Sequence, residues 1–253
     1  MDSPSLYLIP VTLGDTPIEQ VLPAYNKEVI LGIRHFIVEE VRTARRFLKQ
    51  VDKNIDIDQL TFYPMGKHAD RALFSEYLKP LREGLDMGVI SEAGCPAIAD
   101  PGADVVAIAQ SEGLKVVPLV GPSSILMSLM ASGFNGQNFA FHGYLPIGNH
   151  ERLSALKRME TISATEGQTQ LFIETPYRNH QMISDIIAAC NPSTRLCIAA
   201  GITCGPDEYI RTHTIRQWKQ SLNTLPDLKK IPAIFLISAH GSKGKAAGNK
   251  RKG

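Results

Sequence analysis

The sequence predicts an α/β protein of two α/β domains, with a mainly parallel sheet in the N-terminal domain and a mixed sheet in the C-terminal one. Three observations lead to this prediction. Short apolar runs alternate with longer helical patterns over roughly the first 120 residues. After Gly121 the pattern changes, and two apolar runs follow each other across a short loop that contains glycine. The length of 253 residues also suits two domains of about 120 residues each.

The N-terminal domain, residues 1–118, is expected to hold five strands. Each is a short apolar run, and they lie at residues 6–11, 29–33, 60–63, 87–91 and 116–120. Helical patterns fill the intervals between them, at residues 18–25, 39–51, 69–84 and 103–113. Gly84 and Gly113 stand where helices should end, because glycine readily takes the left-handed conformation of a C-cap. This regular alternation is typical of a parallel sheet.

The C-terminal domain, residues 119–240, is expected to be less regular. Its helices are predicted at residues 123–132, 151–161, 178–190 and 216–223, and its strands at residues 139–144, 170–174, 196–200, 208–214 and 233–238. The strands at 196–200 and 208–214 are separated by a short loop, which predicts an antiparallel hairpin. Residues 241–253 are polar and rich in glycine, so they are expected to form a disordered tail.

The charge is unevenly distributed along the chain. Lysine and arginine number 27 and acids 25, but residues 241–253 hold five of the bases and no acid, so residues 1–240 carry 22 bases against 25 acids. The overall composition excludes a disordered, collagen-like or disulfide-scaffold protein. No apolar run approaches the roughly 18–20 residues that span a bilayer. The first four residues lack the pattern of a signal peptide, so we expect a cytoplasmic protein without membrane association.

The cysteines do not indicate a metal site. Cys95, Cys190, Cys197 and Cys204 form no CxxC pair and have no histidine at zinc-finger spacing. We therefore expect no metal, and interpret these residues as reduced structural thiols.

Common motifs for dinucleotide binding, phosphate loops, serine hydrolases and zinc proteases are missing from the sequence. What remains are three loops, each directly after a predicted strand, at residues 13–17, 91–102 and 120–124. Ligands of open α/β sheets bind outside the carboxyl ends of the strands, so these loops indicate a small-molecule pocket. Loop 91–102 carries most of this inference, because two prolines and two glycines in nine residues leave it stiff and poor in side chains. Taken alone, each of the other two loops is better explained by helix capping than by a ligand site.

Loop 91–102, Ser-Glu-Ala-Gly-Cys-Pro-Ala-Ile-Ala-Asp-Pro-Gly, resembles the signature of the tetrapyrrole (corrin/porphyrin) methylase superfamily. The resemblance continues through residues 117–124, 141–146 and 172–178, and covers nearly the whole chain except the tail. It is greatest for the branch that methylates a ribose 2′-hydroxyl of small-subunit ribosomal RNA. The resemblance implies S-adenosylmethionine as cofactor, bound between two α/β domains, and a homodimer.

The resemblance also implies which positions contact S-adenosylmethionine. They are Pro10, Ala93, Gly94, Cys95, Ile98, Ser123, Ser124, Leu145, Ala200, Gly201, Pro232 and Ala233. For Leu145 and Ala233, hydrophobic periodicity alone predicts only core strands.

Four residues match the positions that the resemblance makes catalytic: Glu40, Arg42, His68 and Asp70. A ribose hydroxyl is a weak nucleophile, so such an acceptor needs a base or a positioning network. Taken without the resemblance, the charges of residues 39–49 also fit a solvated helix face with ion pairs between successive turns.

The leading hypothesis is an S-adenosylmethionine-dependent methyltransferase acting on a cytidine 2′-hydroxyl of small-subunit ribosomal RNA, with phosphate contacts from the basic helix 42–49, Arg71 and the tail. Two alternatives stay open. The substrate is a tetrapyrrole or another small molecule, or the protein binds S-adenosylmethionine and has lost catalysis. Both rest on departures from the branch pattern at Val41, at Ala69 and at residues 202–206, each of which removes a polar group.

Overall fold

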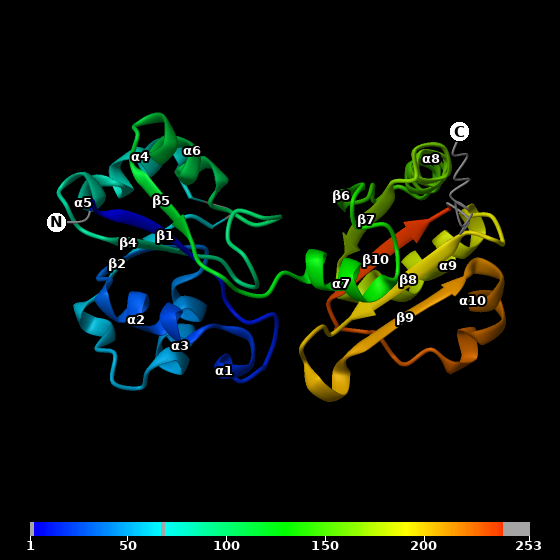
Figure 1. Cartoon of the computed structure of the whole chain (residues 1–253), viewed down its shortest axis with the longest axis horizontal. Coiled ribbons are helices and arrows are strands. Elements are labelled where there is room, and N and C mark those ends of the chain that lie inside the picture. Colours follow the sequence, from blue (N-terminus) through cyan, green and yellow to red (C-terminus); the bar gives the residue numbers. More distant parts are fainter. Residues whose placement is uncertain (1–2, 67–68, 240–253) are drawn as a thin grey trace, which may run out of the picture. The chain divides into compact units, whose positions relative to one another are not determined.

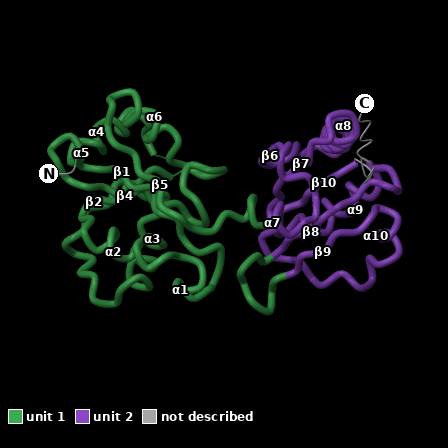
Figure 2. Tube along the Cα trace, in the orientation of Figure 1, with its two compact units in different colours: residues 1–127, 201–208 green, residues 128–200, 209–253 purple. Residues whose placement is uncertain are grey.

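The computed structural model describes residues 3–66 and 69–239, so His68 and the tail expected at 241–253 lie outside the described residues. The chain divides into two compact units (Figures 1 and 2). The first comprises 1–127 and 201–208, the second 128–200 and 209–253, and the division falls within helix α7 (Ser124–Ser132). We expected residues 119–240 to form one domain. Residues 201–208 instead group with the first unit, where the Thr16 hydroxyl donates to the carbonyl of Thr203 at 2.7 Å.

The first unit is built on a five-stranded parallel sheet, which confirms the predicted fold class for this half of the chain. The strand order is β3-β2-β4-β1-β5. The strands are β1 (Ser5–Ile9), β2 (His35–Val38), β3 (Thr61–Pro64), β4 (Met87–Ile90) and β5 (Lys115–Pro118). The three central strands are covered on both faces, which explains why they read as nearly continuous apolar runs.

Helices cover both faces of this sheet (Figure 1). On one face, α2 (Ala24–Gly32) and α3 (Val41–Val51) pack against Ile9 and Phe36. On the other, α4 (Phe74–Tyr77), α5 (Lys79–Arg82) and α6 (Ala103–Ser111) pack against Leu6 and Ile37. A short helix, α1 (Ile18–Val21), precedes α2.

Two predictions for the first unit are wrong in detail. Residues 29–33, expected as a strand, form most of the second half of α2 and the residue that follows it, while the second strand lies at His35–Val38. A short β-branched apolar run does not distinguish a strand from a buried helix segment, and pairing on both sides with β3 and β4 selected the later run. The helices expected at 18–25 and 69–84 are each broken. Pro23 separates α1 from α2, and Pro80, which has no N–H to donate, occupies the first turn of a new helix, α5.

The second unit is built on a mixed sheet, as predicted, with strand order β6-β7-β10-β8-β9. Its strands are β6 (Phe139–Tyr144), β7 (Thr169–Glu174), β8 (Arg195–Ala200), β9 (Tyr209–Thr214) and β10 (Ala233–Ser238). Only β6 and β7 run parallel among the described pairs, and β8 and β9 form the expected antiparallel hairpin.

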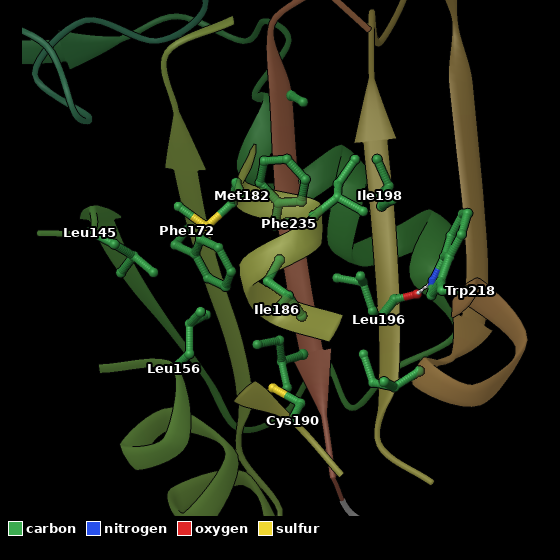
Figure 3. Packing of buried hydrophobic residues seen from close by; sticks show 14 of the residues in the cluster. Leu145, Leu156, Phe172, Met182, Ile186, Cys190, Leu196, Ile198, Trp218 and Phe235 are labelled. Carbon is green, nitrogen blue, oxygen red and sulfur yellow. Dashed lines mark hydrogen bonds between the residues drawn. The ribbon is translucent and has the colours of Figure 1, made fainter. Parts of the chain in front are cut away.

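One face of this mixed sheet carries the main apolar core of the unit, under α8 (Asn149–Glu166), α9 (Asn179–Ala189) and α10 (Ile215–Ser221). Figure 3 shows Phe172 and Phe235 stacked on neighbouring strands, with ring centroids 5.7 Å apart. The indole N–H of Trp218 donates to the carbonyl of Leu196 at 2.9 Å, so the buried ring leaves no unmet donor.

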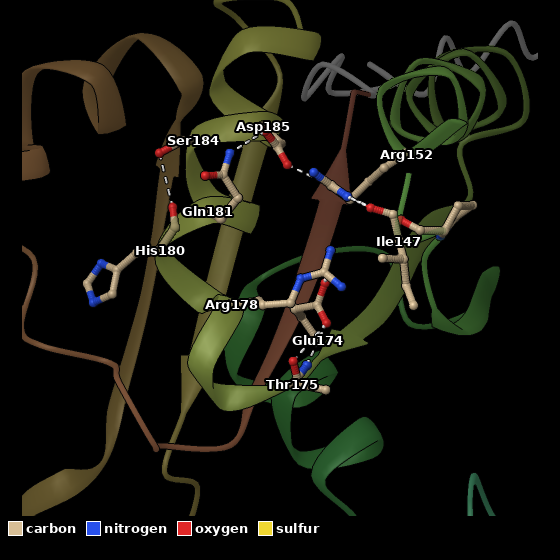
Figure 4. A network of polar contacts seen from close by, with 10 residues as sticks. Ile147, Arg152, Glu174, Thr175, Arg178, His180, Gln181, Ser184 and Asp185 are labelled. Carbon is tan, nitrogen blue, oxygen red and sulfur yellow. Dashed lines mark hydrogen bonds and ion pairs between the residues drawn. The ribbon is translucent and has the colours of Figure 1, made fainter. Parts of the chain in front are cut away.

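A buried ion pair joins α8 to α9 (Figure 4). The guanidinium of Arg152 lies 2.6 Å from the Asp185 carboxylate, and both side chains are less than 10% exposed. Arg152 also donates to the carbonyl of Ile147, and Gln181 donates to Asp185. Because each member of the pair has at least one further hydrogen-bond partner, the pair can stay ionised away from water.

No helix within residues 3–66 and 69–239 is both long enough and apolar enough to cross a membrane.

Candidate functional site

The candidate site lies at the carboxyl edge of the parallel sheet, outside β1 and β4. These two strands are neighbours, yet the chain leaves β1 toward α2 on one face and leaves β4 toward α6 on the other. A crevice opens where neighbouring connections diverge in this way, and it is the usual ligand site of such sheets. The three loops singled out in the sequence all begin at this edge.

Backbone contacts tie these loops together. The amide of Val11, after β1, donates to the carbonyl of Gly94, after β4, at 2.9 Å. Pro10 lies against Gly121, after β5, so closely that a Cβ built on Gly121 would stand 2.3 Å from the Cγ of Pro10. Glycine is therefore the residue that this approach admits at position 121.

Loop 91–102 has an unusual backbone. Gly94, Ala97, Ala99 and Gly102 all have positive φ, at 67°, 67°, 62° and 125°. Left-handed alanine costs roughly 1–2 kcal/mol, so two such residues in one loop indicate a conformation held for function.

A cavity of about 400 Å³ lies beside this loop on the α6 face of the sheet. Its lining is almost wholly apolar and includes Cys95, Ile98 and Leu119. Ile98 is 53% exposed, although it is a large apolar residue. Burial raises the pKa of the Cys95 thiol, so the cavity presents a neutral sulfur rather than a thiolate.

A second cavity, of about 490 Å³, lies on the α3 face of the sheet. It is lined by the loop after β1, by α3 and by residues 90–92, and it shares no lining residue with the first cavity.

Carboxylates gather between β2 and β4 at the same edge. The amide of Glu92 donates to the Glu39 carboxylate at 3.2 Å, and the Thr43 hydroxyl hydrogen-bonds to the Glu92 carboxylate. Burial raises the pKa of Glu39, and the Glu92 amide partly opposes this rise. Burial likewise raises the pKa of Asp100. The arrangement thus holds acids that take up protons more readily than exposed carboxylates do.

The residues predicted to be catalytic are distributed differently. Glu40 is the N-cap of α3, where its carboxylate accepts from the amide of Arg42 at 3.2 Å, and the side chains of both are exposed. Asp70 caps a short 3₁₀ turn by accepting from the amide of Ala72 at 3.0 Å. Over the described residues, no hydrogen bond or ion pair joins Asp70 to Glu40 or Arg42. His68 lies outside the described residues.

Sequence reasoning missed Glu39, Thr43, Glu92 and Asp100 as one group. Glu39 directly follows β2, and the displaced strand prediction at 29–33 concealed this strand-end position. Glu92 and Asp100 belong to the loop that the sequence did single out. At Val41 the chain lacks a polar group that the branch pattern has. Thr43, two residues later on the first turns of α3, places a hydroxyl near that position.

The positions proposed to bind the cofactor fall in both units. Pro10, Ala93, Gly94, Cys95, Ile98, Ser123, Ser124 and Gly201 belong to the first unit, and Leu145, Ala200, Pro232 and Ala233 to the second. Within the second unit, Ala200 and Ala233 face each other across β8 and β10, and Leu145 belongs to the same core (Figure 3). Pro232, just before β10, is exposed.

No family model matches the chain. Its sequence is similar to proteins named ribosomal RNA small subunit methyltransferase I. The one from Vibrio cholerae serotype O1 is 27% identical over 201 residues, which is 79% of this chain and 66% of that protein. The one from Escherichia coli O157:H7 is 28% identical over 198 residues, or 78% and 65%. The chain spans slightly less than two thirds of the length of these relatives.

Solved structures with the same fold are also methyltransferases. CobJ aligns with a TM-score of 0.60 at 14% identity, over 94% of each chain. The cobalt precorrin-4 methyltransferase CbiF aligns at 0.57 and 15% identity, over 92% of this chain and 94% of that one. The uroporphyrin-III-C-methyltransferase of Thermus thermophilus aligns at 0.54 and 15%, over 94% and 93%. The predicted two-domain fold and its resemblance to tetrapyrrole methylases are thus confirmed.

Proposed function

We propose that this chain is an S-adenosylmethionine-dependent methyltransferase that methylates the 2′-hydroxyl of a cytidine in small-subunit ribosomal RNA. The observation that carries the proposal is the contact among three loops at the β1/β4 edge, where ligands of such sheets bind. The relatives of the chain are named ribosomal RNA methyltransferases, which supports the choice of substrate. Carboxylates with raised pKa values at the same edge supply groups that can accept a proton.

The residues of loop 91–102 fit the proposed cofactor. S-adenosylmethionine carries an adenine ring and a positively charged sulfonium, and when bound it supplies the methyl group. The apolar cavity beside Cys95 and Ile98 suits a flat ring, and Gly94 and Ala97 let the backbone approach a ligand closely. Asp100, within the same loop, adds a carboxylate that favours a cationic ligand.

Glu39 is the proposed proton acceptor in place of Glu40. A general base works best when its pKa approaches the working pH, and the half-buried Glu39 has a raised pKa. Glu40 is committed to capping α3, which leaves Arg42 and Asp70 as proposed contacts to the RNA rather than to the transferred proton.

The proposed assembly is a cytoplasmic homodimer acting on the small ribosomal subunit. Leu126 and Met130 are 51% and 82% exposed one turn apart on α7, and Val120 nearby in the sequence is 72% exposed. Large apolar side chains that line one helix face are typical of a surface covered by a partner, here a second copy of the chain.

The experiment combines ligand binding with methyl transfer. Binding of S-adenosylmethionine is measured by calorimetry, and transfer of labelled methyl to small ribosomal subunits by scintillation. Mass spectrometry of the digested RNA then identifies 2′-O-methylcytidine. Absence of cofactor binding at millimolar concentration would contradict the proposal.

Glu39→Gln and Glu40→Gln form a matched pair of variants. General-base catalysis is worth about 10²–10⁴-fold, so Glu39→Gln should lower kcat by about that factor while cofactor affinity is retained. Glu40→Gln keeps an oxygen that can accept from the Arg42 amide, so it should leave the helix cap, and with it turnover, nearly unchanged. Equal loss of turnover in the two variants would refute the assignment of Glu39.

A tetrapyrrole substrate is the second candidate, favoured by the solved structures that share the fold. Incubation with uroporphyrinogen and labelled cofactor tests it directly. RNA binding should weaken steeply between 50 and about 200 mM salt, whereas binding of a buried small molecule should not. Cofactor binding without transfer to either substrate would indicate a protein that has lost catalysis.

A further inference from the structure

The cavity on the α3 face has a lining chemistry distinct from that of the cavity beside Cys95. Its volume of about 490 Å³ lies in the range of roughly 300–1,000 Å³ typical of small-molecule pockets. The loop after β1 forms one wall, α3 another, and residues 90–92, at and just after the end of β4, complete it. Val11, one of its lining residues, is joined by a backbone bridge to Gly94 at the β1/β4 edge.

Charged and polar groups in this cavity match the parts of a nucleotide. Arg46 is the cation among its lining residues, and no ion pair or hydrogen bond involving its side chain occurs within residues 3–66 and 69–239. A free guanidinium recognises phosphate through paired hydrogen bonds. Glu92 and Asp15 offer carboxylate oxygens to hydroxyl groups, and Gln50 offers an amide that can both donate and accept.

The apolar part of the lining suits a base. Leu13 lies on the same loop as Asp15, and Phe47 on the same helix as Arg46, so each wall offers an apolar side chain beside a charged one. The Thr43 hydroxyl bonds to Glu92 within the same lining, which fixes the carboxylate where a ribose hydroxyl would meet it.

We propose that this cavity holds one nucleotide of an RNA substrate, with Arg46 on its phosphate, Glu92 on its ribose and Gln50 on its base. The inference rests on the proposed function for the identity of the polymer. The site itself is defined by the lining residues and is separate from the cavity proposed for the cofactor. It assigns substrate binding to the α3 face of the sheet, in addition to the proposed cofactor site beside Cys95 and the helix cap at Glu40.

Arg46→Ala tests the proposal against Lys53→Ala, which removes an exposed cation just after α3 that does not line the cavity. Two probes are used. Binding of cytidine 5′-monophosphate is measured by calorimetry and by NMR of the α3 amides. Small ribosomal subunits serve as the substrate in the methyl-transfer assay. Arg46→Ala should weaken cytidine monophosphate binding and raise KM for the subunits, each by about tenfold or more, with cofactor affinity unchanged. Lys53→Ala should match the wild type. Gln50→Leu, a second variant without charge change, should weaken cytidine monophosphate more than ribose 5-phosphate.

The outcomes separate this inference from the proposed function. If the wild type methylates RNA but Arg46→Ala and Lys53→Ala behave alike, the nucleotide site is wrong. The same holds if S-adenosylmethionine displaces cytidine monophosphate competitively. If no RNA is methylated while Arg46-dependent binding of cytidine monophosphate persists, the proposed function fails and the nucleotide site stands. Tighter binding of a ribosomal RNA fragment than of the free nucleotide identifies a polymer as the source of the ligand.

Discussion

Replacing Gly121 by alanine tests whether the contact between the β1 and β5 loops positions the site. The added Cβ would stand 2.3 Å from the Cγ and 2.4 Å from the Cβ of Pro10, and 3.1 Å from a methyl of Leu22. Carbon atoms pack at about 3.5–4.0 Å, so the two loops must separate by roughly 1.2 Å or more. Pro10 is buried and its ring is rigid, so the backbone itself has to move.

Two effects of measurable size follow from this displacement. Overpacking of this kind costs about 1–3 kcal/mol, so unfolding of the first unit should shift by that amount. A shift of about 1 Å at a positioned group lowers rates by on the order of 100-fold, so methyl transfer should fall more than stability does.

Hydrogen exchange of the β1 and β5 amides in urea measures the first effect. The only tryptophan in the chain, Trp218, lies in the second unit, so its fluorescence follows the unfolding of that unit as an internal reference. Gly32→Ala is the matched control, because Gly32 ends α2 and its Cβ would meet no atom within 4 Å. Equal exchange rates and equal rates of methyl transfer in Gly121→Ala and Gly32→Ala would refute the reasoning.

Three further predictions concern buried charged and reactive groups. Asp185→Ala leaves the buried guanidinium of Arg152, in the second unit, without its carboxylate partner. The free energy of unfolding, followed by Trp218 fluorescence in urea, should therefore fall by about 3–5 kcal/mol. A fall of less than about 1 kcal/mol would contradict the burial of the pair. The pKa of Glu39 is raised by burial, so the stability that this group contributes is fully present below about pH 4.5 and is lost as pH rises through its folded pKa. Glu39→Gln should therefore be more stable than the wild type at pH 7 but not at pH 4. Thermal denaturation at both pH values can check this. Burial raises the pKa of Cys190 to about 12, so this thiol should resist iodoacetamide at pH 8 in the folded protein, and rapid labelling of the peptide in mass spectrometry would show the burial to be wrong.

Most elements of the fold could be predicted from local patterns. The strand at 87–90 and the hairpin of β8 and β9 were found because each buries a continuous or alternating apolar run. The second strand was misplaced, because 29–33 and 35–38 are both short and β-branched. Two tertiary features distinguish the runs: the packing of α2 over Ile9 and Phe36, and the pairing of 35–38 with β3 and β4.

The site was predicted as a set of loops but not as a set of acids. Positions of glycine and proline mark loop 91–102 in the sequence itself, since these residues restrict or free the backbone locally. The catalytic residues taken from the resemblance include Glu40, while the structure gives the neighbouring Glu39 the half-buried position and the raised pKa. Which of two adjacent acids faces inward depends on where β2 ends, and that was the misplaced strand.

The sequence by itself determined the parallel sheet, the mixed sheet and the three loops at the strand ends, because periodicity and turn residues act over a few neighbours. Only the tertiary structure brought Glu92 to Glu39, 53 residues apart, and Thr203 to Thr16, 187 residues apart. The first contact follows from the strand order β3-β2-β4-β1-β5, which places β4 next to β2, and the second from the loop between β8 and β9, which groups with the first unit. Strand order is set by the packing of whole faces against helices. No local pattern in the chain encodes it, and it decides which side chains share the site.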